Sequence, residues 1–200
     1  MRWAAVRGAV FGIAVMAAVP ALADEIADKL EAARTAYSHA DALRTLAALQ
    51  AAETALTVKL VDQFGRIMPP PPAGWDATPS ESQSLDEVGG GLTVTRGYQK
   101  GASVLTASLI VDNPSVANSI ALFQPATGST DGAVGWKPVK LGAENALVRF
   151  DPPNREGEIL LVIQGRAALQ IEGSEIDGEQ ILVDTAQGWN LVQLRKLLGS

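Results

Sequence analysis

The sequence predicts an α+β fold in which an N-terminal α-helical hairpin is followed by an antiparallel β-sheet packed with helices. Three observations lead to this class. Residues 24–64 contain neither proline nor glycine and are rich in alanine, which favours helix. Four consecutive prolines at positions 69–72 then exclude helix. Beyond residue 91, apolar and polar residues alternate with the period of two that is typical of half-buried strands.

Composition excludes several functional classes. The 200 residues are 47% hydrophobic and 19% charged, which is typical of a globular chain. A net charge of −6 leaves no basic surface for phosphates, so we expect no nucleic-acid partner. Without cysteine there is no disulfide, thiol nucleophile or zinc ribbon, and a single histidine excludes a His-rich metal centre. We therefore expect neither a cofactor nor a metal.

Residues 1–23 have the pattern of a secretory signal peptide. Two arginines precede an uninterrupted apolar run, and Pro20 and small residues follow it, which predicts cleavage between Ala23 and Asp24. The alternative, an uncleaved membrane span, needs about 20 apolar residues, but only 16 residues separate the second arginine from Asp24. A lipid anchor on a processed cysteine is excluded. The pattern predicts export to the periplasm with no membrane span after cleavage.

The hairpin is expected over residues 24–65. Its apolar faces comprise Ile26, Leu30, Ala33 and Tyr37 in the first helix and Leu46, Leu49, Leu56 and Leu60 in the second. Asp41 is the predicted N-cap of the second helix, Gly65 is the residue that ends it, and Glu53 interrupts its apolar stripe. The hairpin is expected to dock on the following domain or on another copy of itself.

The hairpin also looks like one tetratricopeptide-type helix pair over residues 32–52. Such proteins bury their core by stacking repeats, and no second copy is present, so a peptide-binding solenoid is not expected. His39 falls in the turn between the helices, with no serine, cysteine or carboxylate pattern around it that would suit a general base.

Residues 66–91 are expected to be a Pro/Gly-rich linker. The four prolines predict a polyproline II rod about 12 Å long. The polar stretch 78–87 is expected to be a loop. Gly89 to Gly91 lack the Gly-Lys-Ser/Thr sequence and the following helix of a phosphate loop, so they are interpreted as a flexible entry to the next strand.

Residues 92–200 are expected to form the α+β sandwich. Strands are predicted at 92–99, 105–111, 136–141, 146–150, 158–164 and 167–172, and a short helix at 116–123. Ser174 and Asp177 have the spacing of a capping box for a helix that runs through residues 181–182. Asn190 is the predicted cap of a last helix.

Four short motifs carry a resemblance to known proteins. They are Pro72-Ala73-Gly74-Trp75, Gly89-Gly90-Gly91, Arg96-x-Tyr98 and Val111-Asp112-Asn113-Pro114. With the order of elements, they resemble the α/β/α sandwich of the PsbP-like superfamily and a group of uncharacterised exported bacterial proteins with an N-terminal helix pair. The likeness covers most of the chain after the signal peptide. It implies architecture and supplies no catalytic residue.

The remaining chemical candidates are few. Asp151, Glu156 and Glu158 flank a turn but lack calcium-loop spacing, so a solvated acidic loop is expected. No Gly-x-Ser-x-Gly or His-Glu-x-x-His sequence is present, and no enzymatic activity is predicted. Arg96 shares the parity of Tyr98 on an otherwise apolar strand face, so it either reaches the sheet edge to pair locally or binds an anionic ligand together with Tyr98.

These observations favour an exported, non-enzymatic accessory or protein-interaction protein with an unidentified protein partner. The alternative is a module that binds a small apolar or anionic ligand between sheet and helix, with Arg96 and Tyr98 at the mouth. An exposed apolar stripe on the hairpin would favour the first hypothesis, and a concave pocket that contains Arg96 would favour the second.

Overall fold

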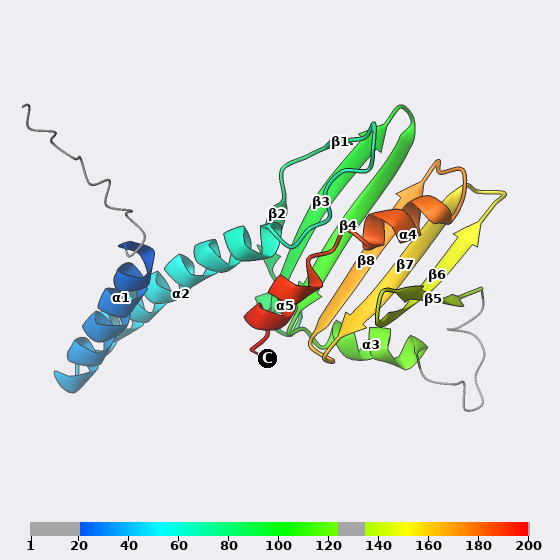
Figure 1. Ribbon diagram of the computed structural model, residues 1–200. Coiled ribbons are helices and arrows are strands. Elements are labelled where there is room, and N and C mark those ends of the chain that lie inside the picture. The colour runs from blue at the N-terminus through cyan, green and yellow to red at the C-terminus, as the bar shows by residue number, and fades with distance from the viewer. Residues whose placement is uncertain (1–20, 124–134, 200) are drawn as a thin grey trace, which may run out of the picture. The chain divides into compact units, whose positions relative to one another are not determined.

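The computed structural model describes residues 21–123 and 135–199, and it confirms the predicted fold class (Figure 1). Two helices are followed by an antiparallel sheet with further helices packed on it. The chain divides into two units, residues 1–59 and 60–200, which are described separately. Residues 1–20 of the predicted signal peptide lie outside the described residues. The predicted cleavage junction after Ala23 lies in the first turn of helix α1.

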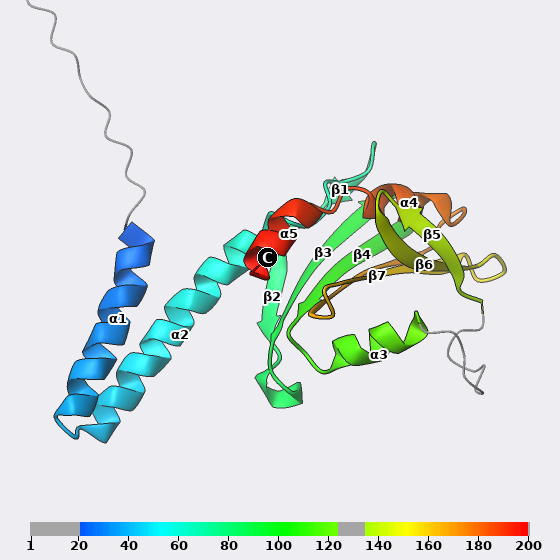
Figure 2. The ribbon, with the colours of Figure 1, turned by 60° about the horizontal axis from the view of Figure 1, so that its bottom comes forward.

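Helices α1 (Ala21–Ser38) and α2 (Ala42–Gly65) form the predicted hairpin (Figure 2). The backbone N–H of Arg44 donates to Oδ1 of Asp41 at 3.0 Å, which confirms the predicted N-cap. Ala33 and Ala52 are each 4% exposed. Burying two methyl groups gives this helix pair little hydrophobic stabilisation of its own.

The second unit is built on one eight-stranded antiparallel sheet in the order β1-β3-β4-β8-β7-β6-β5, with β2 also paired to β3. The strands are β1 (Asp76–Ala77), β2 (Glu81–Ser84), β3 (Leu92–Lys100), β4 (Ser103–Val111), β5 (Lys137–Leu141), β6 (Glu144–Asp151), β7 (Glu156–Ile163) and β8 (Ala167–Ser174). The helices are the 3-10 turn η1 (Asp86–Val88) and α3 (Ser115–Leu122), α4 (Gln180–Ala186) and α5 (Leu191–Leu197). The sequence alternation thus located all six long strands.

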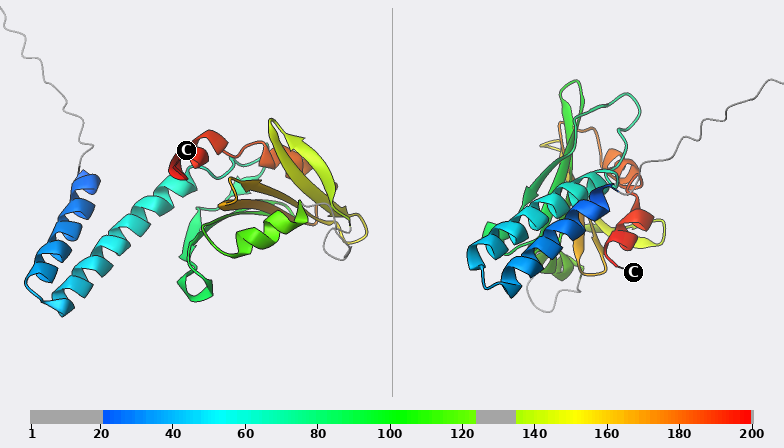
Figure 3. Two further views of the ribbon diagram at one scale, coloured as in Figure 1. Left: turned by 90° about the horizontal axis from the view of Figure 1, so that it is seen from below. Right: turned by 90° about the vertical axis from the view of Figure 1, so that its left-hand side faces the viewer.

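Different helices cover the two faces of the sheet, α4 and α5 on one and α3 on the other (Figure 3), and strand side chains alternate between these faces. One face, which we call the inner face, carries the main core and is covered by α4 and α5; its most buried members include Leu105, Leu109, Ile159, Leu161, Leu169 and Ile171. On the outer face, α3 covers a smaller cluster around Val116, Leu160 and Ala168. The rest of the outer face carries the polar side chains of β4, β6, β7 and β8.

The segment expected to be a linker contributes to the core. Ile67 is fully buried and Met68 is 5% exposed, and both belong to the main hydrophobic cluster. The backbone N–H of Asn190 donates to the carbonyl of Ile67 at 3.1 Å. The first prolines lie against Gly188, where an added Cβ would be 2.9 Å from Cδ of Pro70. The packing therefore begins before the prolines.

Two local predictions were wrong. The stretch 78–87 contains strand β2, whose four residues are all exposed and therefore show no apolar alternation; only backbone pairing with β3 creates it. Ser174 does not cap a helix, because it lies in β8 opposite Val104, and α4 begins only at Gln180.

The last predicted cap is confirmed, since Oδ1 of Asn190 accepts from the N–H of Gln193 at 3.1 Å at the start of α5. Among the described residues, no helix combines the length and the apolar character that crossing a membrane requires.

Candidate functional site

Arg96 and Tyr98 lie together on the inner face of β3, but packing accounts for both. The Tyr98 side chain is 1% exposed, and its hydroxyl donates to the carbonyl of Pro69 at 2.6 Å. Nε of Arg96 donates to the carbonyl of Thr78 at 3.1 Å, and its guanidinium carbon is 5.8 Å from the centroid of the Tyr98 ring. Arg96 thus bonds at the sheet edge, as the local-pairing interpretation required, and the Tyr98 hydroxyl is committed to the backbone.

Removal of this hydroxyl by Tyr98→Phe is expected to lower the free energy of unfolding by about 1–3 kcal/mol, because the Pro69 carbonyl loses its partner in the core. Burial raises the pKa of Tyr98 to about 12, and the nearby Arg96 charge opposes this shift. Unfolding returns the phenol to a pKa of about 10. The stabilisation by neutral Tyr98 is therefore complete below about pH 10 and is lost as the pH rises toward 12.

Urea unfolding of the wild-type chain and Tyr98→Phe at about pH 9 and about pH 11 measures both effects. The wild type should lose more stability than the variant between the two values. Equal losses would show that Tyr98 does not titrate as a buried phenol.

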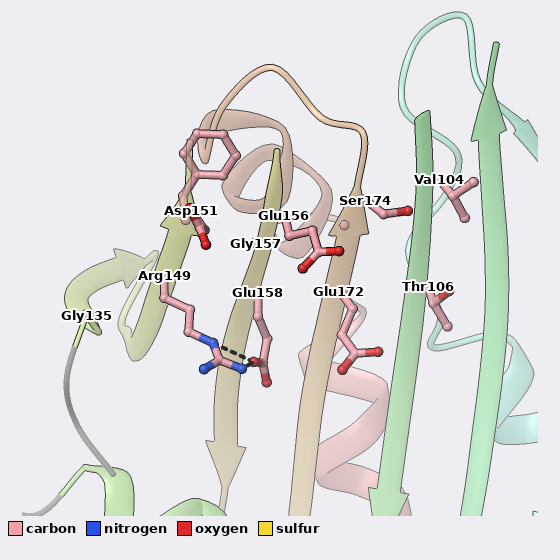
Figure 4. A pocket seen from close by; sticks show the side chains of 12 residues that line it. Val104, Thr106, Gly135, Arg149, Asp151, Glu156, Gly157, Glu158, Glu172 and Ser174 are labelled. Atoms are coloured by element: carbon pink, nitrogen blue, oxygen red, sulfur yellow. Dashed lines mark hydrogen bonds and ion pairs between the residues drawn. The ribbon is translucent and has the colours of Figure 1, made fainter. Parts of the chain in front are cut away.

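A groove lies on the opposite, outer face, where β4, β6, β7 and β8 run side by side (Figure 4). Its volume is about 580 Å³. It is lined by Val104, Thr106, Gly135, Arg149, Phe150, Asp151, Glu156, Gly157, Glu158, Glu172, Gly173 and Ser174. Neither Arg96 nor Tyr98 is among these residues.

Strand register brings the polar groups of the groove together. Glu158 lies directly opposite Arg149 on β6 and Glu172 on β8. Its Oε2 accepts from Nε and Nη2 of Arg149 at 2.9 and 2.5 Å, and its Oε1 accepts from Nε2 of Gln170 at 2.7 Å. The same Gln170 nitrogen donates to Glu172 at 2.9 Å. The guanidinium of Arg149 also lies over the Trp136 ring, 4.9 Å from its centroid.

This network determines the chemistry that the groove offers. Glu158 is 9% exposed, and its charge is compensated by Arg149, so it is poorly placed to move a proton to or from a ligand. Asp151, Glu156 and Glu172 leave the groove acidic, which disfavours an anionic ligand there. Across residues 21–123 and 135–199, no three His, Cys, Asp or Glu side chains are grouped so that they could hold a metal ion.

Sequence reasoning singled out Glu158 but not its partners. Asp151, Glu156 and Glu158 are close in sequence, yet Glu158 pairs with Arg149, and Asp151 accepts from Asn154 instead. The sequence feature that could have identified Arg149 and Glu172 is the alternation along β6 and β8, which places both side chains on the outer face. Parity alone could not identify which strands are neighbours.

The hairpin, which is the described part of the first unit, carries exposed apolar side chains. Leu30, Tyr37, Leu46, Leu49 and Leu56 retain between 44% and 77% of their exposed area. All five belong to the apolar stripes predicted from the sequence, which were expected to be covered. The stripe of α2 continues into Leu60, which is half-buried against the core of the second unit, and Phe64, which belongs to that core. His39 is exposed in the turn, as expected.

Comparison of the chain with protein-family models, with curated proteins and with solved structures found no match. The resemblance to the PsbP-like sandwich and to exported bacterial proteins therefore stays a prediction. The surfaces described above are the basis for a functional proposal.

Proposed function

We propose that this chain is an exported, periplasmic protein-interaction protein that acts without catalysis, and that the hairpin supplies its contact surface. The observation that carries the proposal is the exposed apolar surface formed by Leu30, Tyr37, Leu46, Leu49 and Leu56. Exposed apolar patches on otherwise polar chains commonly mark protein contacts. Covering the half of each side chain that is now exposed would contribute about 1 kcal/mol per residue.

Two further observations support this function over the ligand-binding alternative. On the inner face, core side chains lie between the sheet and helices α4 and α5, and the hydroxyl of Tyr98 bonds to Pro69 among them. No buried side-chain nitrogen or oxygen of the described residues lacks a hydrogen-bond partner that a ligand would have to supply. A ligand bound between the inner face and α4 or α5 would have to displace core side chains.

The function can be tested by cross-linking the chain in its own host and identifying cross-linked proteins, the chain itself included, by quantitative mass spectrometry. We expect a stoichiometric protein contact for the wild type and its loss when Leu49 and Leu56 are both replaced by lysine. Lysine at both positions places two charged groups on the contact surface, and these groups would have to lose their hydration when the partner binds.

The matched control is Leu43→Lys combined with Val58→Lys. Leu43 and Val58 are 82% and 64% exposed on α2, and the helical period places them away from the stripe of Leu49 and Leu56. This variant should keep the contact. Equal cross-linking by all three chains, or a co-purifying small molecule with no protein contact, would contradict the proposal.

A further inference from the structure

We propose that the partner of the hairpin surface is a second copy of this chain, and that two hairpins associate face to face as a four-helix bundle. This inference rests on the proposed function and names its partner. It is carried by the spacing of the hairpin residues, by their burial, and by the position of two opposite charges.

Each helix of the hairpin carries two adjacent seams with alternating spacings of three and four residues. The inner seam, which is buried or half-buried, comprises Ile26, Lys29, Ala33 and Ala36 in α1 and Thr45, Ala48, Ala52, Ala55 and Lys59 in α2. The outer seam follows it by one residue and comprises Ala27, Leu30, Arg34 and Tyr37 in α1 and Leu46, Leu49, Glu53 and Leu56 in α2. Every member of the outer seam as far as Leu56 is exposed, and Leu60, the next residue at this spacing, is half-buried.

Two seams on one helix indicate two helical neighbours. The 3,4 spacing is that of residues that pack between helices, and an isolated pair needs only one such seam. The inner seams bury Ala33 and Ala52 between α1 and α2, so the outer seams have the pattern of a helix contact without its partner.

The outer seams of the two helices lie on the same side of the hairpin. In both helices the outer seam is displaced from the inner seam by one residue, which is about 100° around the axis. Helices α1 and α2 run in opposite directions along the hairpin (Figure 2). The rotation therefore moves both outer seams to the same side. The result is one flat apolar face made by two helices. A second hairpin supplies the two antiparallel helices that such a face requires.

Charge complementarity favours a second copy and defines its orientation. The outer seam contains one basic residue, Arg34 in α1, and one acidic residue, Glu53 in α2, and each directly follows the buried alanine of its helix. Pairing like helices across a twofold axis would bring equal charges together. Pairing α1 of one copy with α2 of the other places Glu53 against Arg34 twice, and Arg34 also donates to Glu31 of its own helix at 2.8 and 2.7 Å.

Side-chain direction agrees with this second arrangement. Helical side chains lean toward the N-terminus of their helix, so Arg34 and Glu53 lean toward each other when α1 and α2 of different copies are antiparallel. The turns of the two hairpins then lie at the same end of the bundle.

Sedimentation equilibrium of the full chain, purified after expression in its host, tests the stoichiometry. We expect a dimer for the wild type and for Val58→Lys. For Leu49→Lys/Leu56→Lys we expect a dissociation constant at least about 100-fold higher, because both substitutions fall in the centre of the face. Circular dichroism must show equal helix content in the variants, since the substituted side chains are exposed in the monomer.

Charge reversal tests the orientation without removing apolar surface. Glu53→Arg should weaken the dimer about tenfold, and addition of Arg34→Glu should restore most of the affinity. In addition, the chain has no cysteine, so Arg34→Cys and Glu53→Cys each introduce a single thiol. When the two variants are mixed and oxidised, disulfides should join one Arg34→Cys chain to one Glu53→Cys chain in preference to two chains of the same variant.

The remaining outcomes distinguish the two proposals. A wild-type monomer that cross-links through Leu49 and Leu56 to another protein would overturn the dimer and keep the proposed function. A monomer whose α2 amides around Leu49 gain hydrogen-exchange protection only when the second unit is folded would overturn both. If disulfides form preferentially between two chains of the same single-cysteine variant, the α1-to-α2 orientation is overturned.

Discussion

Gly91→Ala is expected to lower the free energy of unfolding by more than about 3 kcal/mol. Gly91 has φ +88°, and a Cβ added to it would lie 2.2 Å from the carbonyl oxygen of Val111 and 2.8 Å from two backbone atoms of Asp112. These contacts are with backbone of the neighbouring strand, which cannot move aside without breaking the pairing of β3 and β4. Urea unfolding followed by tryptophan fluorescence measures the effect.

Gly90→Ala is the matched control, because Gly90 also has φ +88° but an added Cβ would meet nothing within 4 Å. Gly90→Ala should lower the free energy of unfolding by about 1–2 kcal/mol, which is the cost of a positive φ for an alanine. The side chain of Asn113 donates to the carbonyl of Gly90 at 2.6 Å and holds this loop in place, so the strain cannot relax freely. If both variants lose the same stability, the close approach at Gly91 does not matter.

Ile67→Ala is expected to lower the free energy of unfolding by about 2–5 kcal/mol, as other large-to-small substitutions at fully buried positions do. This prediction tests whether the segment between hairpin and sheet belongs to the core, since a residue in a free linker would tolerate alanine. The same urea titration measures it.

The adjacent Arg66→Ala supplies the comparison. Arg66 is exposed, and its ion pair with Asp62 is exposed too, so alanine should change stability by less than about 0.5 kcal/mol. Equal effects of Ile67→Ala and Arg66→Ala would indicate that the residues before the prolines do not belong to the core.

Prediction from sequence succeeded where a repeating pattern reports burial. The alternation of Leu105, Ala107, Leu109 and Val111 identifies β4, and the 3,4 spacing of alanine and leucine identifies the hairpin. Local capping was predictable where the side chain bonds within its own turn, as Asp41 and Asn190 do. Ser174 has the same local pattern, but ladder pairing with β4 placed it in a strand.

The candidate surfaces were predicted only in part. The apolar residues of the hairpin were found correctly, but their exposure was not, because periodicity shows that a stripe exists and not what covers it. The Arg149–Glu158 pair was missed, since it depends on which strands are neighbours and in which register. The hydrogen-bond partner of Tyr98 was missed for a similar reason, because Pro69 is 29 positions away in the chain.

By itself, the sequence determined the fold class, the six long strands and the apolar stripes of the hairpin, because each follows from a short-range period or a local bond. The tertiary structure decided the rest: the burial of Ile67 and Tyr98, the pairing of β2, and the ion pair in the outer groove. These features join segments far apart in the chain. Their energies arise from contacts that no local pattern encodes.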